Sequence, residues 1–481
     1  MPDFDVLIIG AGLAGVGMAC RLEEAGANLR YAILERRDRI GGTWDFFRYP
    51  GIRSDSDMYT LSYPFRPWLN SKVLAEGPAI RDYIEETAQA YDVTRNIEFG
   101  IKVESANFST ADNSWTVTAR REVDGAEVGL TARFLVMCTG YYDYDQGYLP
   151  DLPGREQFQG ILIHPQHWPE GLDCAGKAVV VIGSGATAVT LVPALAKTAR
   201  HVTMLQRSPS YIFSIPAEDK MARALGRVLP KNWVSRMARS RNLLLQRTIY
   251  KASQRFPKQM RRLLLSAVRK QVGPGVDQSH FQPTYNPWDE RLCAVPDGDL
   301  FKTLRSGDAS IVTDAIEHFT AEGILLKSGR HLDADIVVSA TGLRLKMLGG
   351  ISIRVDGAAQ MLNEGVTYKG VMAAGIPNLA FVFGYTNIPW TVRADLSALW
   401  IVRLLTHMRS NSLTQAVAYA PAEVVETASI MDSMQSGYVK RGESELPRQG
   451  RGGPWQVTND LNIDKPLLLR QPVDDGILQF S

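Results

Sequence analysis

The chain has 481 residues, enough for two or three domains with hydrophobic cores of their own. Its formal net charge is +2, so bulk charge gives no support for a nucleic-acid partner. The four cysteines (Cys20, Cys138, Cys174 and Cys293) lack CxxC spacing, which argues against a redox disulfide or a metal site. No signal sequence precedes the first predicted strand and no apolar run reaches membrane-spanning length, so we expect a cytoplasmic protein without stable membrane insertion.

The N-terminal segment predicts a dinucleotide-binding βαβ unit. A strand is expected over residues 5–9, an alanine-rich helix to about residue 25, and a second strand over residues 30–34 that ends at Glu35. The acid lies at the distance expected for a ligand of ribose hydroxyls. A glycine turn without function is the alternative, and the combination of strand, helix and acid favours the nucleotide site.

The turn of this unit has the residue types that a pyrophosphate requires. Its candidate cofactor-binding residues are Gly10, Gly12, Ala14 and Gly15. Gly10 allows the tight turn, Gly12 lets the backbone approach the pyrophosphate, and Gly15 brings helix and strand together. The pyrophosphate then lies at the N-terminus of the helix.

A small antiparallel sheet is predicted next. Residues 97–108 and 115–120 alternate apolar and polar side chains, with a turn at Asp112 and Asn113. The apolar strand at residues 134–140 then closes the first nucleotide fold.

A second glycine turn follows the buried strand at residues 178–182. It comprises Gly183, Ser184, Gly185, Ala186, Thr187 and Ala188. The next strand, residues 201–205, leads to Gln206, Arg207 and Ser208, so an arginine stands near the position of the usual acid. A 2′-phosphate would repel an acid and pair with a guanidinium, which favours NADPH over NADH.

Residues 220–270 are rich in Lys and Arg and contain no Asp or Glu. Phe256, Met260, Leu263, Leu264 and Val268 recur at helical spacing. Three interpretations remain open: a solvated helical insertion with one buried face, which we favour, a wall of a substrate tunnel, and a surface that contacts membranes. The prolines at 216, 230 and 257 would divide the segment into several helices.

The last third of the chain is predicted to complete the first nucleotide-binding domain. An Ala-Thr-Gly turn ends at Gly342, and a helix is expected over about residues 391–408. The glycine-rich segment around Trp455 has two interpretations, a disordered connector or a mobile loop that closes over NADPH with Trp455 as its anchor.

The most specific pattern lies between the two nucleotide folds. It has five fixed positions, Phe158, Gly160, His164, Trp168 and Pro169. From residue types alone this is a buried linker in which His164 makes one core hydrogen bond. As a unit, F-x-G-x-x-x-H-x-x-x-W-P resembles the fingerprint of Baeyer–Villiger monooxygenases.

Over essentially its whole length the chain resembles class B flavoprotein monooxygenases, and within them the ethionamide-activating type of Baeyer–Villiger monooxygenase. The segments that carry this likeness are residues 41–61, 163–170, 181–196 and 286–293. The resemblance implies an α/β fold with two Rossmann-like domains, one for FAD and one for NADPH. It also implies that O2 is consumed through a C4a-peroxyflavin. Ketones, by analogy open-chain ones, would become esters or lactones, and sulfides would be oxidised as a side activity.

The resemblance also assigns residues. Gly42, Thr43 and Trp44 would contact phosphate and flavin, and Val103 would pass the adenine. Arg291 would be the catalytic cation beside the flavin, with Asp55 as the acid that orients it. Arg53, Ser54, Arg207 and Trp455 would shape the NADP⁺ pocket. Glu290 departs from the pattern, since many family members have a lysine there that helps bind the 2′-phosphate.

The resulting domain prediction has four parts. Residues 1–145 form the first part of the FAD domain, 146–170 the linker, 171–342 the NADPH domain with a helical insertion at about 212–285, and 343–481 the rest of the FAD domain, with a mobile loop at about 446–458. The main rival is an N- or S-oxygenating flavin monooxygenase, from which Trp168 and Arg291 would distinguish this chain. A non-catalytic protein that binds or senses NADPH is a further alternative.

Overall fold

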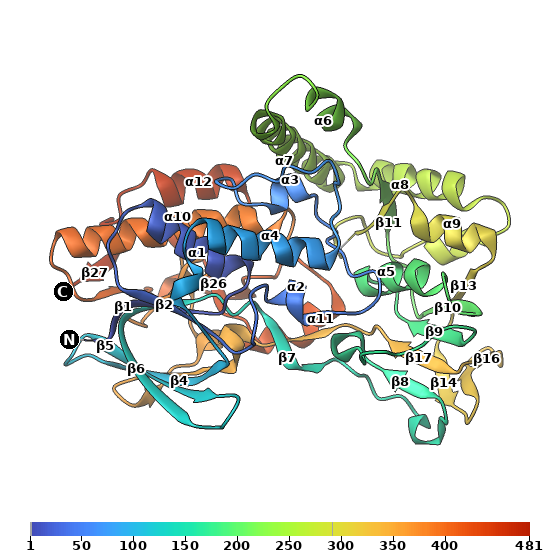
Figure 1. Cartoon of the computed structure of the whole chain (residues 1–481), viewed down its shortest axis with the longest axis horizontal. Helices are drawn as coiled ribbons and strands as arrows, with labels where there is room; N and C mark the ends of the chain where they lie inside the picture. The colour runs from blue at the N-terminus through green and yellow to red at the C-terminus, as the bar shows by residue number, and fades with distance from the viewer. Residues whose placement is uncertain (1, 291) are drawn as a thin grey trace.

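Two sheets organise the chain, and each receives one of the predicted glycine turns. The structure is a computed structural model that describes residues 2–290 and 292–481. Figure 1 shows the first domain, built from both ends of the chain, beside the second domain, built from its middle. The predicted α/β class with two dinucleotide folds is confirmed.

The sheet of the first domain is centred on β1 (Phe4–Ile9). β1 pairs in parallel with β2 (Tyr31–Glu35) and with β6 (Glu127–Met137). β4 (Ile101–Ser109) and β5 (Ser114–Arg121) form the predicted antiparallel ladder with β6. The smaller strands of this sheet are β3 (Ile97–Phe99), β19 (Ser352–Val355), β20 (Ala358–Ala359), β21 (Thr367–Tyr368), β22 (Met372–Ala373) and β23 (Leu379–Phe381).

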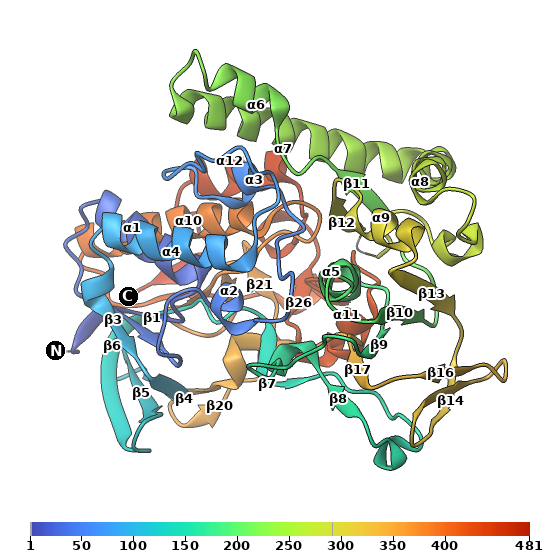
Figure 2. The same ribbon diagram turned by 45° about the vertical axis from the view of Figure 1, so that its right-hand side comes forward.

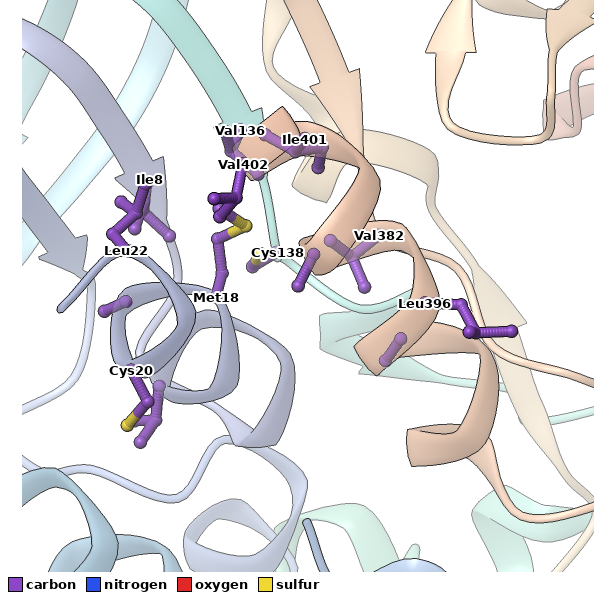
Figure 3. Packing of buried hydrophobic residues seen from close by; sticks show 14 of the residues in the cluster. Ile8, Met18, Cys20, Leu22, Val136, Cys138, Val382, Leu396, Ile401 and Val402 are labelled. Carbon is purple, nitrogen blue, oxygen red and sulfur yellow. The ribbon is translucent and has the colours of Figure 1, made fainter. Parts of the chain in front are cut away.

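Helices cover one face of this sheet. α1 (Leu13–Glu24) packs on α10 (Trp390–Ser410), so the two ends of the chain share one core. Figure 3 shows side chains of this cluster, among them Ile8 of β1, Met18 of α1 and Val402 of α10. The other helices of the domain are α2 (Thr43–Phe46), α3 (Met58–Leu61), α4 (Gly77–Ala90), α11 (Gly437–Arg441) and α12 (Leu461–Leu469).

The second domain contains a five-stranded parallel sheet in the order β13-β10-β9-β17-β8. Its strands are β8 (Ile161–Ile163), β9 (Ala178–Ile182), β10 (His201–Gln206), β13 (Ala309–Thr313) and β17 (Ile336–Ser339). α5 (Ala186–Leu195) follows the glycine turn, and α9 (Asp299–Ser306) packs beside it. β8 comes from the segment predicted as linker, so this segment supplies an edge strand of the second sheet.

Further short strands complete the fold. In the second domain they are β11 (Ile212–Ile215), β12 (Cys293–Pro296), β14 (Ile316–Phe319), β15 (Gly323–Leu326) and β16 (His331–Asp333). In the first they are β24 (Ala416–Ala418), β25 (Val425–Ser429), β26 (Arg448–Gly450) and β27 (Leu478–Phe480).

The basic segment forms three helices, α6 (Lys220–Leu225), α7 (Lys231–Arg255) and α8 (Pro257–Val272). Pro230 caps α7 and Pro257 is the first residue of α8, as the breaks at prolines predict. Of the apolar positions singled out in the sequence, Val268 is buried, but Phe256 and Leu263 are exposed. The expected single buried face is therefore only partly present. Among the described residues, none of the helices has both the length and the apolar composition of a membrane span.

Candidate active site

A cavity of about 440 Å³ opens at the carboxyl ends of β1 and β2. It brings together most of the residues assigned to the first dinucleotide, together with Ser54, assigned to the NADP⁺ pocket, and Asp55, assigned to the catalytic pair. These are Gly10, Gly12, Ala14, Glu35, Gly42, Thr43, Trp44, Ser54, Asp55 and Val103. Such a crevice at the carboxyl ends of parallel strands is where open α/β sheets bind ligands.

The geometry of the first glycine turn explains its residue types. Gly10 has a φ of +103°, and a Cβ on it would lie 2.7 Å from the carbonyl oxygen of Cys138. A Cβ on Gly15 would lie 1.9 Å from the carbonyl oxygen of Gly10, which is a direct clash. A Cβ on Gly12, in contrast, would meet only the backbone of Gly42, with its Cα at 3.5 Å and its N at 3.9 Å, which are ordinary contacts. Packing within the protein therefore does not require glycine at position 12. The close approach of a ligand remains as the reason for a glycine at this position.

Glu35 is held in place by the backbone. Its Oε2 accepts the N–H of Ala11 at 2.7 Å, and its Oε1 accepts the N–H of Arg37 at 2.8 Å. The side chain is buried, and burial raises the pKa of the carboxyl group above its ordinary value, while the two N–H donors oppose this shift. The oxygens thus keep a fixed position at the end of β2, suited to ribose hydroxyls.

The residues present fit FAD. The backbones of Gly12 and Gly42 approach each other closely, since a Cβ on Gly42 would lie 3.0 Å from the Cα of Gly12, and the φ of +53° at Gly42 also favours glycine. Both glycines line the cavity, and Gly12 is the N-cap of α1. This combination can hold a pyrophosphate. α10 begins at Trp390, and Ile388 and Trp390 line the cavity, so the N-terminus of this late helix lies at the edge of the cavity.

Sequence reasoning missed several cavity residues. Tyr141, Tyr144, Lys346 and Trp390 line it, and the rings of Tyr141 and Trp390 stack at 4.9 Å. Tyr144 and Thr43 share a hydrogen bond of 3.3 Å between their hydroxyls. These side chains come from distant parts of the sequence, and neither periodicity nor a glycine pattern marks them.

The catalytic pair assigned by resemblance is only partly described. Asp55 lines the cavity, whereas Arg291 lies outside the described residues. Arg53, assigned to the NADP⁺ pocket, forms an ion pair with Asp299 at 2.7 Å and is not among the residues that line the cavity. Its buried Nε has no hydrogen-bond partner among the described residues. An unsatisfied buried donor of this kind fits a site that a ligand completes.

The second glycine turn has the same form as the first. Gly183 has a φ of +136°, and a Cβ there would lie 2.4 Å from the carbonyl oxygen of Ala340. A Cβ on Gly185 would meet nothing within 4 Å, so this turn is also open where a pyrophosphate would approach. Ser184 donates to the carbonyl of Ser208 at 3.0 Å, which ties the turn to the segment after β10. Ala188 is buried, and Ala186 and Thr187 begin α5.

Arg207, predicted to bind the 2′-phosphate, is exposed directly after the end of β10. The carboxyl group of Glu290 lies close enough to Arg207 for the two side chains to interact electrostatically. Burial raises the pKa of the Glu290 carboxyl group, while Lys440 and Arg207 act to lower it. Lys440, on α11, is a cation of this region that the sequence did not reveal.

The two domains meet at the segment around Tyr49 and Gly51. Phe47 and Tyr49 belong to the core of the second domain. Burial raises the pKa of Tyr49 to about 12, and a hydrogen bond with Thr187 partly offsets this. Gly51 has a φ of +78°, and a Cβ on it would lie 2.8 Å from the Cβ of Ala194 on α5. This turn therefore forms part of the contact between the two domains.

The first half of the fingerprint holds β8 in place. A Cβ on Gly160 would lie 2.4 Å from the ring of Phe158 and 2.5 Å from the carbonyl oxygen of Asp335. The Phe158 ring folds over this glycine and meets Phe319 edge to face at 5.8 Å. Trp168 is half-buried against the core of the second domain, and Pro169 is exposed.

His164 lies where the chain crosses between the domains. Its Nε2 is 3.0 Å from the carbonyl oxygen of Gly342, and its Nδ1 accepts the N–H of Gln166 at 3.2 Å. This arrangement requires a neutral ring with its proton on Nε2. Burial lowers the pKa of His164, in agreement with the neutral form. The two crossing segments pair as β7 (Tyr142–Gly147) and β18 (Leu343–Leu345).

The position of Trp455 differs from the one that we predicted. It is buried in the core of the first domain, where its ring meets Tyr368 edge to face at 5.5 Å. It does not line the cavity. The N–H of Lys369 donates to the carbonyl of Pro454, and β26 pairs with β25. The loop at 446–458 is anchored by this burial, so Trp455 does not lie where a mobile anchor over NADPH was expected.

The four cysteines are buried and free. Across the described chain, no group of three or more His, Cys, Asp or Glu side chains is placed to hold a metal ion.

Comparisons with known proteins show the family to which the chain belongs. Residues 4–348 match the flavin-binding monooxygenase-like family. The chain is 55% identical to the FAD-containing monooxygenase MymA of Mycobacterium tuberculosis over 99% of this chain and 97% of that protein. It is 49% identical to the FAD-containing monooxygenase EthA of the same organism, with the same coverage.

Solved structures show the same fold. OTEMO in complex with FAD and NADP superposes with a TM-score of 0.72 at 24% identity, covering 87% of this chain and 88% of that one. Cyclohexanone monooxygenase bound to ε-caprolactone superposes with a TM-score of 0.70 at 23% identity, covering 86% of this chain and 89% of that one. Two dinucleotide folds around an FAD-type cavity, together with these relatives, place the chain in the flavin-binding monooxygenase-like family, as a flavoprotein monooxygenase.

Proposed function

We propose that this protein is an FAD- and NADPH-dependent Baeyer–Villiger monooxygenase that converts ketones, chiefly open-chain ones, to esters. Sulfide oxidation is the expected side activity. The observation that carries the proposal is the place of His164. This fingerprint residue joins the second domain to the crossing segment at Gly342, so the pattern that distinguishes the class holds the two nucleotide domains together.

The chain's residues have distinct roles in this reaction. The turn at Gly12 and the carboxylate of Glu35 hold FAD, and the turn at Gly185 with Arg207 holds NADPH. Bound FAD, once reduced, supplies the activation of O2. The cavity is lined by aromatic rings such as Tyr141 and Trp390, which exclude water from the reacting region. Arg291, oriented by Asp55, supplies the fixed positive charge that the oxygenation step needs.

The test is a panel of open-chain ketones, cyclic ketones and sulfides with purified holoenzyme. The proposal predicts ester formation from open-chain ketones, with NADPH consumed in step with product. Oxygenation of sulfides or amines without any ester would assign the N- or S-oxygenating activity instead. A sensor would not consume NADPH repeatedly in air.

A further inference from the structure

The helical insertion concentrates the exposed apolar side chains of the protein. Ten of the eighteen large apolar side chains that are exposed in the described chain lie between residues 221 and 263. Five of them gather at one end, and we call them the apical patch: Met221, Val228, Leu229, Trp233 and Met237. Val228 is 78% exposed and Trp233 is 67% exposed. Several large exposed apolar side chains on one projecting element indicate an interaction surface.

The apical patch is formed by a projecting element. Met221 lies on α6, Val228 and Leu229 lie in the loop to α7, and Trp233 and Met237 follow one turn apart on α7. Residues four apart lie on the same face of a helix, so the last two side chains point in one direction. Figures 1 and 2 show α6 and the adjoining part of α7 standing away from the two sheets.

The surroundings of the patch are cationic. Lys220, Arg223, Arg227, Lys231 and Arg236 flank it, and residues 220–270 contain no acidic side chain. Arg223 pairs with Glu218 at 2.7 Å. For the other four, no carboxylate of the described chain lies within ion-pair distance.

The inner face of α7 is fixed to the first domain. Arg239 donates to the carbonyls of Tyr59, Thr60 and Ser62. Asn242 and Gln246 donate to the carboxylate of Asp57 at 2.8 and 2.6 Å. These hydrogen bonds fix the inner face, although the buried Oε1 of Gln246 has no hydrogen-bond partner among the described residues. The helix therefore presents its apolar and cationic outer face in a defined direction.

We propose that α6 and the first half of α7 dock this enzyme on an anionic lipid surface. Apolar side chains of the apical patch would enter the headgroup region, with the Trp233 ring at the interface, while the flanking cations pair with lipid phosphates. A second copy of the chain fits less well. A symmetric contact between two such patches would bring like charges together.

The experiment is co-sedimentation of the FAD-loaded protein with vesicles of neutral phosphatidylcholine alone or mixed with anionic phosphatidylglycerol. The proposal predicts binding to the anionic vesicles at least about tenfold tighter than to neutral ones, weakening as salt is raised. Lys231→Glu with Arg236→Glu should weaken that binding by about 25-fold or more, because each cation near the surface contributes about fivefold. Val228→Asp with Trp233→Ser should have a similar effect.

Matched controls are Val123→Asp, which alters an exposed valine elsewhere, and Lys197→Glu with Lys327→Glu, which makes the same charge change outside the insertion. Both should bind vesicles like the wild type. A readout that does not depend on the folding of the double variants is tryptophan quenching by brominated anionic lipid. The wild type should lose fluorescence, and Trp233→Phe should remove most of that loss.

Three results would overturn the proposal: no preference for anionic vesicles, equal loss of binding in the controls, or unaltered vesicle binding by the patch variants. A patch variant that changes only the mass of the particle in solution would assign the surface to self-association instead.

Discussion

His164 and Gly342 are 178 positions apart, yet the imidazole Nε2 lies 3.0 Å from the glycine carbonyl oxygen. The same carbonyl accepts the N–H of Tyr148 at 3.1 Å, and the Thr341 hydroxyl donates to the carbonyl of Tyr148 at 2.7 Å. The two segments that cross between the domains are therefore locked to each other and to the fingerprint. This makes His164 a positioning residue.

His164→Ala should leave FAD content unchanged and raise the KM for NADPH. The substitution removes one donor from the Gly342 carbonyl and opens a space beside Gly147, at a cost of about 1–3 kcal/mol. His164→Gln can still donate to that carbonyl and should recover most of the loss. Equal KM values in all three proteins would contradict the positioning role.

The same residue predicts a pH dependence of stability. Burial lowers the pKa of His164 in the folded protein, so the unfolded chain binds its proton more readily. The stability contributed by the neutral ring is complete above the unfolded value of about 6.5 and is lost as the pH falls below it. Urea midpoints at several pH values should therefore fall more steeply below that point in the wild type than in His164→Gln.

The two glycines of the first turn should respond differently to alanine. Gly15→Ala meets the Gly10 carbonyl and should destabilise the fold even without FAD. Gly12→Ala meets only ordinary contacts within the protein, so its apo form should unfold like the wild type. Its FAD affinity should still fall roughly tenfold to hundredfold, because the phosphate contacts are charge-assisted. Wild-type FAD affinity in Gly12→Ala would show that the pyrophosphate does not approach this turn.

Arg207→Ala should raise the KM for NADPH roughly tenfold to hundredfold and leave that for NADH nearly unchanged. Arg200→Ala, which removes another arginine of the second domain, is the control. Glu290→Gln should lower the KM for NADPH, because it removes a carboxylate that acts beside Arg207 and Lys440. If Arg207→Ala weakens both nucleotides equally, this arginine does not bind the 2′-phosphate.

Variants of Arg53 and Asp299 can distinguish a direct contact between Arg53 and NADPH from the effect of the ion pair that positions Arg53. Asp299→Asn should weaken only the pairing, and Arg53→Met should lose both the pairing and the donor at Nε. We therefore expect a larger rise in the KM for NADPH from Arg53→Met than from Asp299→Asn, at equal FAD content. A larger rise in the KM for NADPH from Asp299→Asn than from Arg53→Met would mean that Arg53 only stabilises the contact between the domains.

The parts that sequence predicts well are those fixed by local rules. The positive φ values at Gly10 and Gly183 are a local property of each turn, and Glu35 follows at a set distance. The carbonyls of Cys138 and Ala340 that crowd these two glycines come from distant segments. The rest depends on tertiary contacts. Tyr144 and Trp390 reach the cavity from separate segments, and Asp299 meets Arg53 across the domain interface. Trp455 was misjudged because glycines around it suggested mobility, whereas the core beside Tyr368 holds its ring.

The fingerprint shows the same limit. Its pattern indicated the class of enzyme, but the reasons for its residues appear only in three dimensions. Gly160 is needed because the ring of Phe158 and the Asp335 carbonyl leave no space, and His164 is needed at a crossing made by a distant segment.

Ketone oxygenation by Arg291→Ala tests the role assigned to that residue. The variant should still bind FAD, and NADPH should still reduce the flavin without oxygen. In air it should release hydrogen peroxide and form about 10² to 10³ times less ester, because one preorganised charge is lost. Asp55→Ala should show a milder defect, since it removes only the orienting acid. Near-normal ester formation by Arg291→Ala would contradict the assignment.

The most direct test of the proposed activity is the fate of labelled oxygen. Wild-type enzyme, NADPH and an open-chain ketone are incubated under ¹⁸O₂, and the products are analysed by mass spectrometry. The account predicts an ester that contains one labelled oxygen atom, formed in step with NADPH consumption. NADPH consumption without labelled ester, for that ketone and for cyclic ketones, would contradict it.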